Sequence, residues 1–138
     1  MNLVQEKPIL VEGLDGDNVH EHGDVMVFEA NLKDQNGLKV AQLLGQHTVI
    51  DLPGNDGIGD PSMEERFVNL AFVFTNGSKV FVQGASVYPE GQTSIKENIP
   101  QFRAIVGGTE AFRGIRGQVK TTRNSDETYL HVLEYTLD

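Results

Sequence analysis

Short apolar runs rich in β-branched and aromatic residues recur along most of the chain, and polar turn residues separate them. This pattern is typical of strands, and no segment shows the helical repeat of about 3.6 residues. Asn36-Gly37 and Asn76-Gly77 stand between such runs, where Asn-Gly is a strong hairpin signal. The predicted strands are Val25–Leu32, Leu38–Leu52, Arg66–Thr75, Lys79–Tyr88, Phe102–Val106, Phe112–Thr121 and Thr128–Leu137.

The stretch Phe102–Thr121 is dense in glycine and predicts a hairpin within a strongly curved sheet. Gly107 and Gly108 suit a tight corner, because glycine adopts a positive φ without steric cost. Gly114 and Gly117 lie inside the following run, where glycine marks a bulge, a barrel corner or a close approach of two backbones. We therefore expect this hairpin to bend the sheet.

Strands joined mainly by hairpins, without helical crossovers, favour an up-and-down barrel over a parallel sheet. We predict an all-β fold over residues 24–138, a closed antiparallel barrel of about eight strands that is similar to the calycins. Residues 1–23 are polar and rich in turn residues, so we expect an N-terminal arm with a short strand at Ile9–Glu12. A chain of 138 residues suffices for one such domain with its own core.

The predicted strand at Arg66–Phe74 is apolar on both faces. A barrel interior needs only one of them, so the other must be covered, most simply by a second subunit. We therefore expect a homo-oligomer, either a dimer or a trimer. The first face consists of Phe67, Ala71 and Val73, and the second of Val68, Leu70, Phe72 and Phe74.

A family resemblance lies in the glycine-rich hairpin. Ala104–Val119 reads AIVGGTEAFRGIRGQV and resembles the GGTGxFxGARGxV hairpin of the allene oxide cyclase and dirigent proteins. Lys79–Gly84 resembles the strand of that family that ends in Gln-Gly, and the likeness runs from about Val25 to the C-terminus. The resemblance implies a barrel. It leaves the reaction open, because the family holds plant cyclases, dirigent proteins and bacterial polyketide cyclases of the spirotetronate type.

Composition and charge limit the classes of molecule that this protein is expected to bind. The formal net charge is −9, from 20 acidic and 11 basic residues, which argues against nucleic acid and against anionic membranes. The absence of cysteine excludes disulfides, thiolate metal sites and a cysteine nucleophile. The N-terminus shows no signal-peptide pattern and no apolar stretch reaches membrane-spanning length, so we expect a cytoplasmic protein. These features favour the bacterial branch of the family.

Two N-terminal patterns resemble parts of metal sites without completing one. Asp15-Gly16-Asp17-Asn18 begins like a calcium loop, but the twelfth position is Met26 instead of an acidic residue. His20-Glu21-His22 places two imidazoles on one side of an extended segment, with no third ligand nearby in the sequence. We expect a solvated loop here and neither a metal nor a cofactor.

The first candidate catalytic residues are Glu29 and Asn31, which share one face of a predicted strand. The resemblance implies the Glu-x-Asn pair of the allene oxide cyclases, in which the glutamate steers charge in the substrate and the asparagine helps to hold a water that anchors the epoxide oxygen. The resemblance thus implies that Glu29 and Asn31 point into the barrel, whereas the alternation of apolar and polar residues implies that they face solvent. The apolar face of this strand consists of Met26, Phe28, Ala30 and Leu32. Both orientations remain open from the sequence.

His47 is the third candidate catalytic residue. By the resemblance it stands where the plant cyclases carry a cysteine near the conjugated tail of the substrate, which argues against a literal allene oxide cyclase activity. His47 shares a face with Leu43 and Val49, so it is either a satisfied core residue or part of a pocket.

Candidate substrate-binding residues are taken from the apolar strand, the tyrosines and the glycine-rich hairpin. Arg113 shares parity with Ile115 and would point inward on a regular strand, whereas a glycine bulge would turn Arg116 inward instead. A tyrosine offers a hydroxyl on an apolar body, and it is equally a common core residue. The set is Phe67, Asn69, Ala71, Tyr88, Arg113 and Tyr135.

These observations predict a cofactor-free cyclase that folds a hydrophobic, conjugated small molecule inside the barrel for ring closure. The Diels–Alder-type cycloadditions of bacterial polyketide cyclases fit better than the allene oxide cyclase reaction. Two alternatives stay open: a dirigent-like or lipocalin-like barrel that binds a ligand without turnover, and a structural oligomer with a filled barrel. No Ser-His-Asp spacing, nucleophile elbow or nucleotide motif points to another class.

Overall fold

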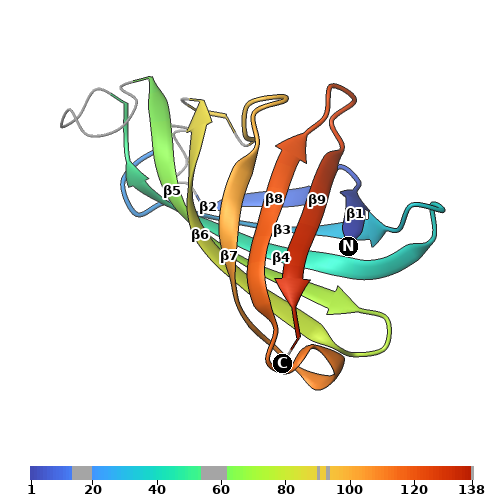
Figure 1. Ribbon diagram of the computed structural model, residues 1–138. Helices are drawn as coiled ribbons and strands as arrows, with labels where there is room; N and C mark the ends of the chain where they lie inside the picture. Colours follow the sequence, from blue (N-terminus) through green and yellow to red (C-terminus); the bar gives the residue numbers. More distant parts are fainter. Residues whose placement is uncertain (14–19, 54–61, 90, 93, 138) are drawn as a thin grey trace.

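A computed structural model describes residues 1–13, 20–53, 62–89, 91–92 and 94–137. These residues form one antiparallel sheet in the order β1-β9-β8-β7-β6-β5-β4-β3-β2 (Figure 1). The calcium-like pattern Asp15–Asn18 lies outside the described residues. The strands are β1 (Asn2–Gln5), β2 (Ile9–Gly13), β3 (Val25–Lys33), β4 (Lys39–Asp51), β5 (Met63–Phe74), β6 (Lys79–Pro89), β7 (Gln101–Gly108), β8 (Arg116–Arg123) and β9 (Tyr129–Thr136).

Strand β1 closes the sheet into a barrel. Its residue Gln5 pairs with Tyr129 of β9 on one side and with Leu32 of β3 on the other. Eight strands therefore form a closed antiparallel barrel, and β2 is an additional strand that pairs only with β3. The predicted all-β barrel is confirmed. The short strand expected at Ile9–Glu12 is present as β2, and the N-terminal residues also supply β1. The two strands are separated around Pro8, because proline cannot continue a hydrogen-bonded ladder.

The turns between strands are as predicted from the sequence at the two Asn-Gly positions, but they differ from the prediction at the glycine-rich hairpin. Gly37 and Gly77 have φ values of 78° and 88° in the turns after β3 and β5. Gly107 and Gly108 continue β7, and neither has a positive φ, so they do not form the predicted tight corner. The chain instead turns through the 3₁₀ helix η1 (Glu110–Phe112).

No helix of the described residues has the length and apolar character needed to cross a membrane.

Alternate residues of each strand fill the barrel, and one end is sealed by aromatic rings. Phe74 and Phe112 lie 4.9 Å apart between ring centroids, and Phe112 meets Tyr135 edge-on at 6.2 Å. They pack against a cluster of buried aliphatic residues and Phe72. This end lies beside η1, at the bottom of Figure 1.

His131 is a buried polar residue of the barrel interior, with 1% of its surface exposed. Its Nε2 donates to Oε1 of Gln5 at 2.7 Å, and the Thr121 hydroxyl lies 2.8 Å from its Nδ1. Because the hydroxyl can donate to Nδ1, the neutral imidazole satisfies both contacts. Burial, with a smaller effect of the Arg103 charge, lowers the pKa of His131 to about 3.

Gly117 allows two strands to approach more closely than a side chain would permit. Its φ is 151°, and a Cβ atom there would lie 2.8 Å from Cα of Tyr135 and would also strike the Glu134 carbonyl oxygen. We predict that Gly117→Ala lowers the free energy of unfolding by more than about 2 kcal/mol, because both the φ and the contact become unfavourable. Urea denaturation measures the change.

The matched control is Gly107→Ala, because Gly107 has no positive φ and open space where a Cβ would lie. That substitution should leave the free energy of unfolding unchanged or raise it by about 0.5–1 kcal/mol. Equal losses of stability in the two variants would contradict the close approach at Gly117.

We also predict that acid weakens the fold through His131. The unfolded chain binds a proton at this residue below a pH of about 6.5, whereas the folded chain does so only near pH 3. The free energy of unfolding should therefore fall by up to about 1.4 kcal/mol per pH unit across that interval. Urea denaturation at several pH values should give a shallower dependence for His131→Gln. An unchanged slope would show that the folded barrel protonates this imidazole.

Candidate functional site

The open end of the barrel contains a pocket of about 490 Å³, which includes its mouth. Its walls come from the segment that joins β1 to β2, the residues between β6 and β7, and the upper parts of the barrel strands. Most of the wall is apolar, and this part consists of Pro8, Leu10, Phe28, Leu43, Leu70 and Ile95.

Tyr88 and His47 are the polar groups at the centre of this wall. Their ring centroids are 5.0 Å apart, and the Tyr88 hydroxyl lies 3.5 Å from Nε2 of His47. Arg103 donates from Nη2 to the same hydroxyl at 3.2 Å and from Nε to Oγ of Ser86 at 2.9 Å. These four side chains are buried, so their positions are fixed by one another.

Arg66 supports this group from behind the pocket wall. Its guanidinium carbon lies 4.0 Å from the centre of the Tyr88 ring, a cation–π contact, and its Nη1 lies 3.4 Å from Nδ1 of His47. The charge of Arg66 is paired with Glu64 at 2.8 Å, and both side chains are inaccessible to solvent. Strand β5 therefore carries a buried ion pair on its inward face.

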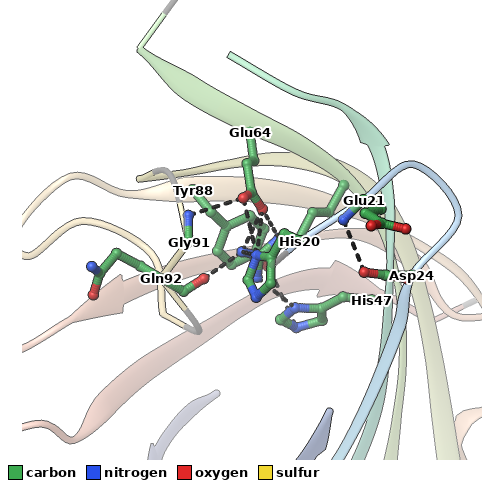
Figure 2. Close-up of polar contacts among 9 residues, drawn as sticks. His20, Glu21, Asp24, His47, Glu64, Tyr88, Gly91 and Gln92 are labelled. Carbon is green, nitrogen blue, oxygen red and sulfur yellow. Dashed lines mark hydrogen bonds and ion pairs between the residues drawn. The ribbon is translucent and has the colours of Figure 1, made fainter. Parts of the chain in front are cut away.

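Glu64 and Arg66 also tie two distant segments to the end of the barrel, and Figure 2 shows Glu64 in contact with His20 and Gly91. The His20 ring contacts the Glu64 carboxylate at 3.0 Å, the amide of Gly91 donates to it at 2.9 Å, and Arg66 donates to the carbonyl of Gln92. Burial acts to raise the pKa of Glu64, but the hydrogen bonds from Gly91, His20 and Arg66 outweigh it and the pKa is lowered. The expectation of a solvated loop was wrong for His20, which is buried at 7% exposure because it packs on this carboxylate.

The protonation states of the pocket follow from these contacts. Burial, then the charges of Arg66 and Arg103, lowers the pKa of His47 to about 3, so the ring is neutral at physiological pH. Arginine can only donate, so Nδ1 of His47 is the acceptor facing Arg66, and the proton sits on Nε2 toward Tyr88. Burial raises the pKa of Tyr88, which keeps its phenol protonated. The Tyr88 oxygen therefore faces two donors, and no described residue accepts its own O–H, which leaves this group able to donate to a ligand.

Several predicted site residues lie on the outside of the barrel. Phe67 is 54% exposed, Asn69 is exposed and Ala71 is half-buried, because β5 turns the opposite set of residues, from Glu64 to Phe72, inward. Glu29 is exposed and Asn31 is half-buried on the outer face of β3, where the apolar alternation places them. Of the two faces of β5 that the sequence left open, the structure therefore turns Phe67, Asn69 and Ala71 outward, and it places Glu29 and Asn31 on the outer face as well.

The remaining candidates fall at both ends of the barrel. His47 and Tyr88 line the pocket. Tyr135 is half-buried at the sealed end against Phe112, so it does not reach the pocket. Arg113 follows η1 and is exposed, and the alternative Arg116 is exposed as well, so neither points inward as the hairpin pattern suggested.

Sequence reasoning missed Arg103, Arg66 and His131. Arg103 shares parity with the buried Ile105 on β7, which is a signal for an inward orientation. A second signal is Gly84, the glycine of the Gln-Gly pair that ends the segment Lys79–Gly84. A Cβ atom at this position would lie 2.8 Å from Cγ of Arg103, so the glycine makes room for the arginine side chain. Arg66 shares parity with the buried Val68 and Leu70 and lies two residues from its ion-pair partner Glu64, whereas its contacts with His20, His47 and Gln92 join distant parts of the chain. Within the described residues, no three histidine, aspartate or glutamate side chains gather as a metal site would require.

Comparisons by sequence and by structure gave different results. No family model and no curated protein matches the sequence. Among solved structures, pyocyanin demethylase matches with a TM-score of 0.71 and 20% identity over 99% of this chain and 98% of that one. The pterocarpan synthase dirigent protein GePTS1 matches with a TM-score of 0.67 and 16% identity over 98% of this chain and 82% of that one.

Two cyclases share the fold as well. A heme-binding cyclase that catalyses a cycloaddition in neoabyssomicin biosynthesis has a TM-score of 0.68 and 15% identity, and this chain spans 62% of its length. The Diels–Alderase AbmU from Streptomyces koyangensis has a TM-score of 0.62 and 16% identity, with 65% of its length spanned. The fold of this chain is therefore the barrel fold shared by dirigent proteins and Diels–Alderase-type cyclases, as the hairpin resemblance implies.

Proposed function

We propose that this protein is a cofactor-independent cyclase that closes a ring in a hydrophobic, conjugated small molecule, by a cycloaddition of the Diels–Alder type used in polyketide biosynthesis. The observation that carries the proposal is the mostly apolar pocket at one end of a barrel whose other end is filled by aromatic rings. A flexible substrate bound against such a wall can be held in a bent conformation. The fold shared with two cyclases supports this assignment.

Shape supplies most of the proposed rate enhancement. Ring closure in a flexible chain is entropically costly, and holding the reacting carbons in contact can remove about 7–11 kcal/mol from the barrier. Phe28 lies against His47 edge-on at 5.2 Å, and together with Leu43 and Leu70 it forms a rigid apolar surface for the conjugated part of the substrate.

Tyr88 is the residue that we place in contact with the reacting system. Its free O–H can donate to a carbonyl oxygen of the substrate, which withdraws electrons from the conjugated double bond and activates it for cycloaddition. His47 and Arg66 are positioning residues, because they hold the phenol ring and fix the direction of its hydroxyl. No step of this reaction requires a proton to leave the substrate.

The proposal is tested with a linear polyene that carries a diene and a carbonyl-activated dienophile. The protein should form one stereoisomer faster than the spontaneous reaction, as followed by chiral chromatography. Binding of the polyene with a spontaneous rate and a mixture of stereoisomers would instead identify a barrel that binds its ligand without turnover.

We predict that Tyr88→Phe slows this turnover by about a hundred- to a thousandfold, the cost of losing one donor to developing charge. The KM should change little, since the apolar surface is retained. The matched control is Tyr135→Phe, which removes a hydroxyl at the sealed end and should leave kcat unchanged. Equal kcat values for the parent and Tyr88→Phe would exclude the phenol from the reaction.

We also infer that the outer face of strands β5 to β7 contacts a second copy of the chain. Phe67, Phe81 and Phe102 are 54%, 39% and 52% exposed there, and Val106 adds to the same face. Continuing the register between β6 and β7 places Ala85 between Phe67 and Phe102, so the apolar residues form one row across three strands. Such a continuous apolar surface is typical of an interface.

The expected solution species is a dimer or trimer, with a mass well above the 15.2 kDa of one chain in sedimentation experiments at low micromolar concentration. Phe67→Asp places a charge in this row and should shift the species toward the monomer. The control Leu38→Asp changes a residue that is 66% exposed at the turn after β3 and should leave the mass unchanged. A parent protein that sediments as a monomer would overturn the inference.

A further inference from the structure

No carboxylate among the described residues balances the charge of Arg103. Its side chain lies in the pocket wall, and the residue is 6% exposed. Among the described residues its hydrogen-bond partners are two hydroxyls, those of Ser86 and Tyr88, and no carboxylate pairs with it. A buried cation without an anion is costly, because neutral hydroxyls recover only part of the lost hydration.

The other groups around the pocket do not neutralise this cation. Its described walls contain no aspartate or glutamate, and the nearby carboxylate of Glu64 is engaged by Arg66, His20 and Gly91. The imidazoles of His47 and His131 are neutral, and the charge of Arg103 contributes to keeping both of them so. Arg103 is therefore the one charged side chain of the described pocket wall.

Some N–H donors of the Arg103 guanidinium are not used by its contacts with described residues. Arginine has five N–H donors, and the contacts of Arg103 with described residues use Nε and one hydrogen of Nη2. Nη1 and the second hydrogen of Nη2 form an edge of the kind that binds a carboxylate or an enolate in a fork. Gly84 packs against the base of the side chain and fixes where this edge lies.

We propose that Arg103 is the anchor for an anionic oxygen, and that the ligand of this barrel is a largely apolar molecule that carries one carboxylate or acidic enol. This inference rests on the proposed function only in taking the pocket as the ligand site, and it adds the charge of the ligand. The pocket carries a positive charge although the net charge of the chain is −9, so the proposed attraction of an anion comes from Arg103 and not from the protein as a whole. The Tyr88 hydroxyl, 3.2 Å from Nη2, lies beside the anchored oxygen.

The test compares decadienoic acid with its methyl ester, because the two share the conjugated chain and differ in charge. Isothermal titration calorimetry near neutral pH should show the acid binding the parent protein about tenfold to a hundredfold more tightly than the ester, the range expected for a charge-assisted hydrogen bond. Arg103→Met should remove this preference while the ester still binds, which also shows that the variant is folded. Arg103→Lys should keep part of the preference.

The matched control is Arg113→Met, which removes an exposed arginine outside the pocket and should retain the preference of the parent. Gly84→Ala keeps the charge of Arg103 and displaces the side chain, so it should weaken binding of the acid more than binding of the ester. A parent protein that binds the two ligands equally, or a preference that persists in Arg103→Met, would overturn the anchor.

The outcomes separate the two proposals. If acid and ester bind the parent equally, the pocket remains a ligand site and only the anionic anchor fails. If neither ligand binds while the polyene with its dienophile is turned over, the anchor fails and the cyclase proposal stands. If the acid is preferred and no polyene is turned over, the anchor stands and the cyclase proposal fails.

Discussion

The ion pair between Glu64 and Arg66 is the interaction on which the open end of the barrel depends. Removing both charges from water carries a penalty of several kcal/mol per ion, and their mutual attraction recovers it only when further hydrogen bonds complete the network. Here the further bonds come from His20, Gly91 and Gln92, so the segments before β3 and after β6 are held by the same two side chains. Removing either charge would leave the other buried and unpaired.

The same ion pair determines the character of the pocket. Arg66 lies against the Tyr88 ring and faces Nδ1 of His47, so it orients the imidazole. Burial, and then the charges of Arg66 and Arg103, lower the pKa of His47 and keep the ring neutral. Because Glu64 already balances Arg66, the charge of Arg103 is the one left for a ligand. The barrel is thus divided along its axis into an apolar, aromatic-sealed end that supplies packing and an open end where buried polar groups are placed with fixed donors.

The sequence predicts the barrel because its signals are local. The Asn-Gly turns and the alternation of short apolar runs each depend on a few neighbouring residues, and the glycine-rich hairpin carries the family resemblance. The orientation of β5 could not be predicted in this way. Phe67 lies outward and Arg66 inward, which inverts the usual preference of both residue types.

The inversion has a non-local cause on each face. Arg66 is stable inside only because Glu64, His47 and the carbonyl of Gln92 receive it, and these groups lie far apart in the chain or gain their positions from the fold. Phe67 faces outward in the row of exposed apolar residues that we propose as an interface between copies of the chain, which the sequence of one chain does not display. The candidates Glu29 and Asn31 show the converse, since simple alternation placed them correctly on the outer face.

The protonation states of the pocket limit the chemistry that it can perform. A general base works best with a pKa near the operating pH, and both imidazoles in the pocket have pKa values of about 3. Tyr88, with its pKa raised, holds its proton, and the described walls include no carboxylate. Reactions that begin by removing a proton from the substrate are therefore poorly served by these groups. The ring closure that we propose redistributes electrons without net proton transfer, and it would use the mostly apolar wall, a fixed donor and one positive charge.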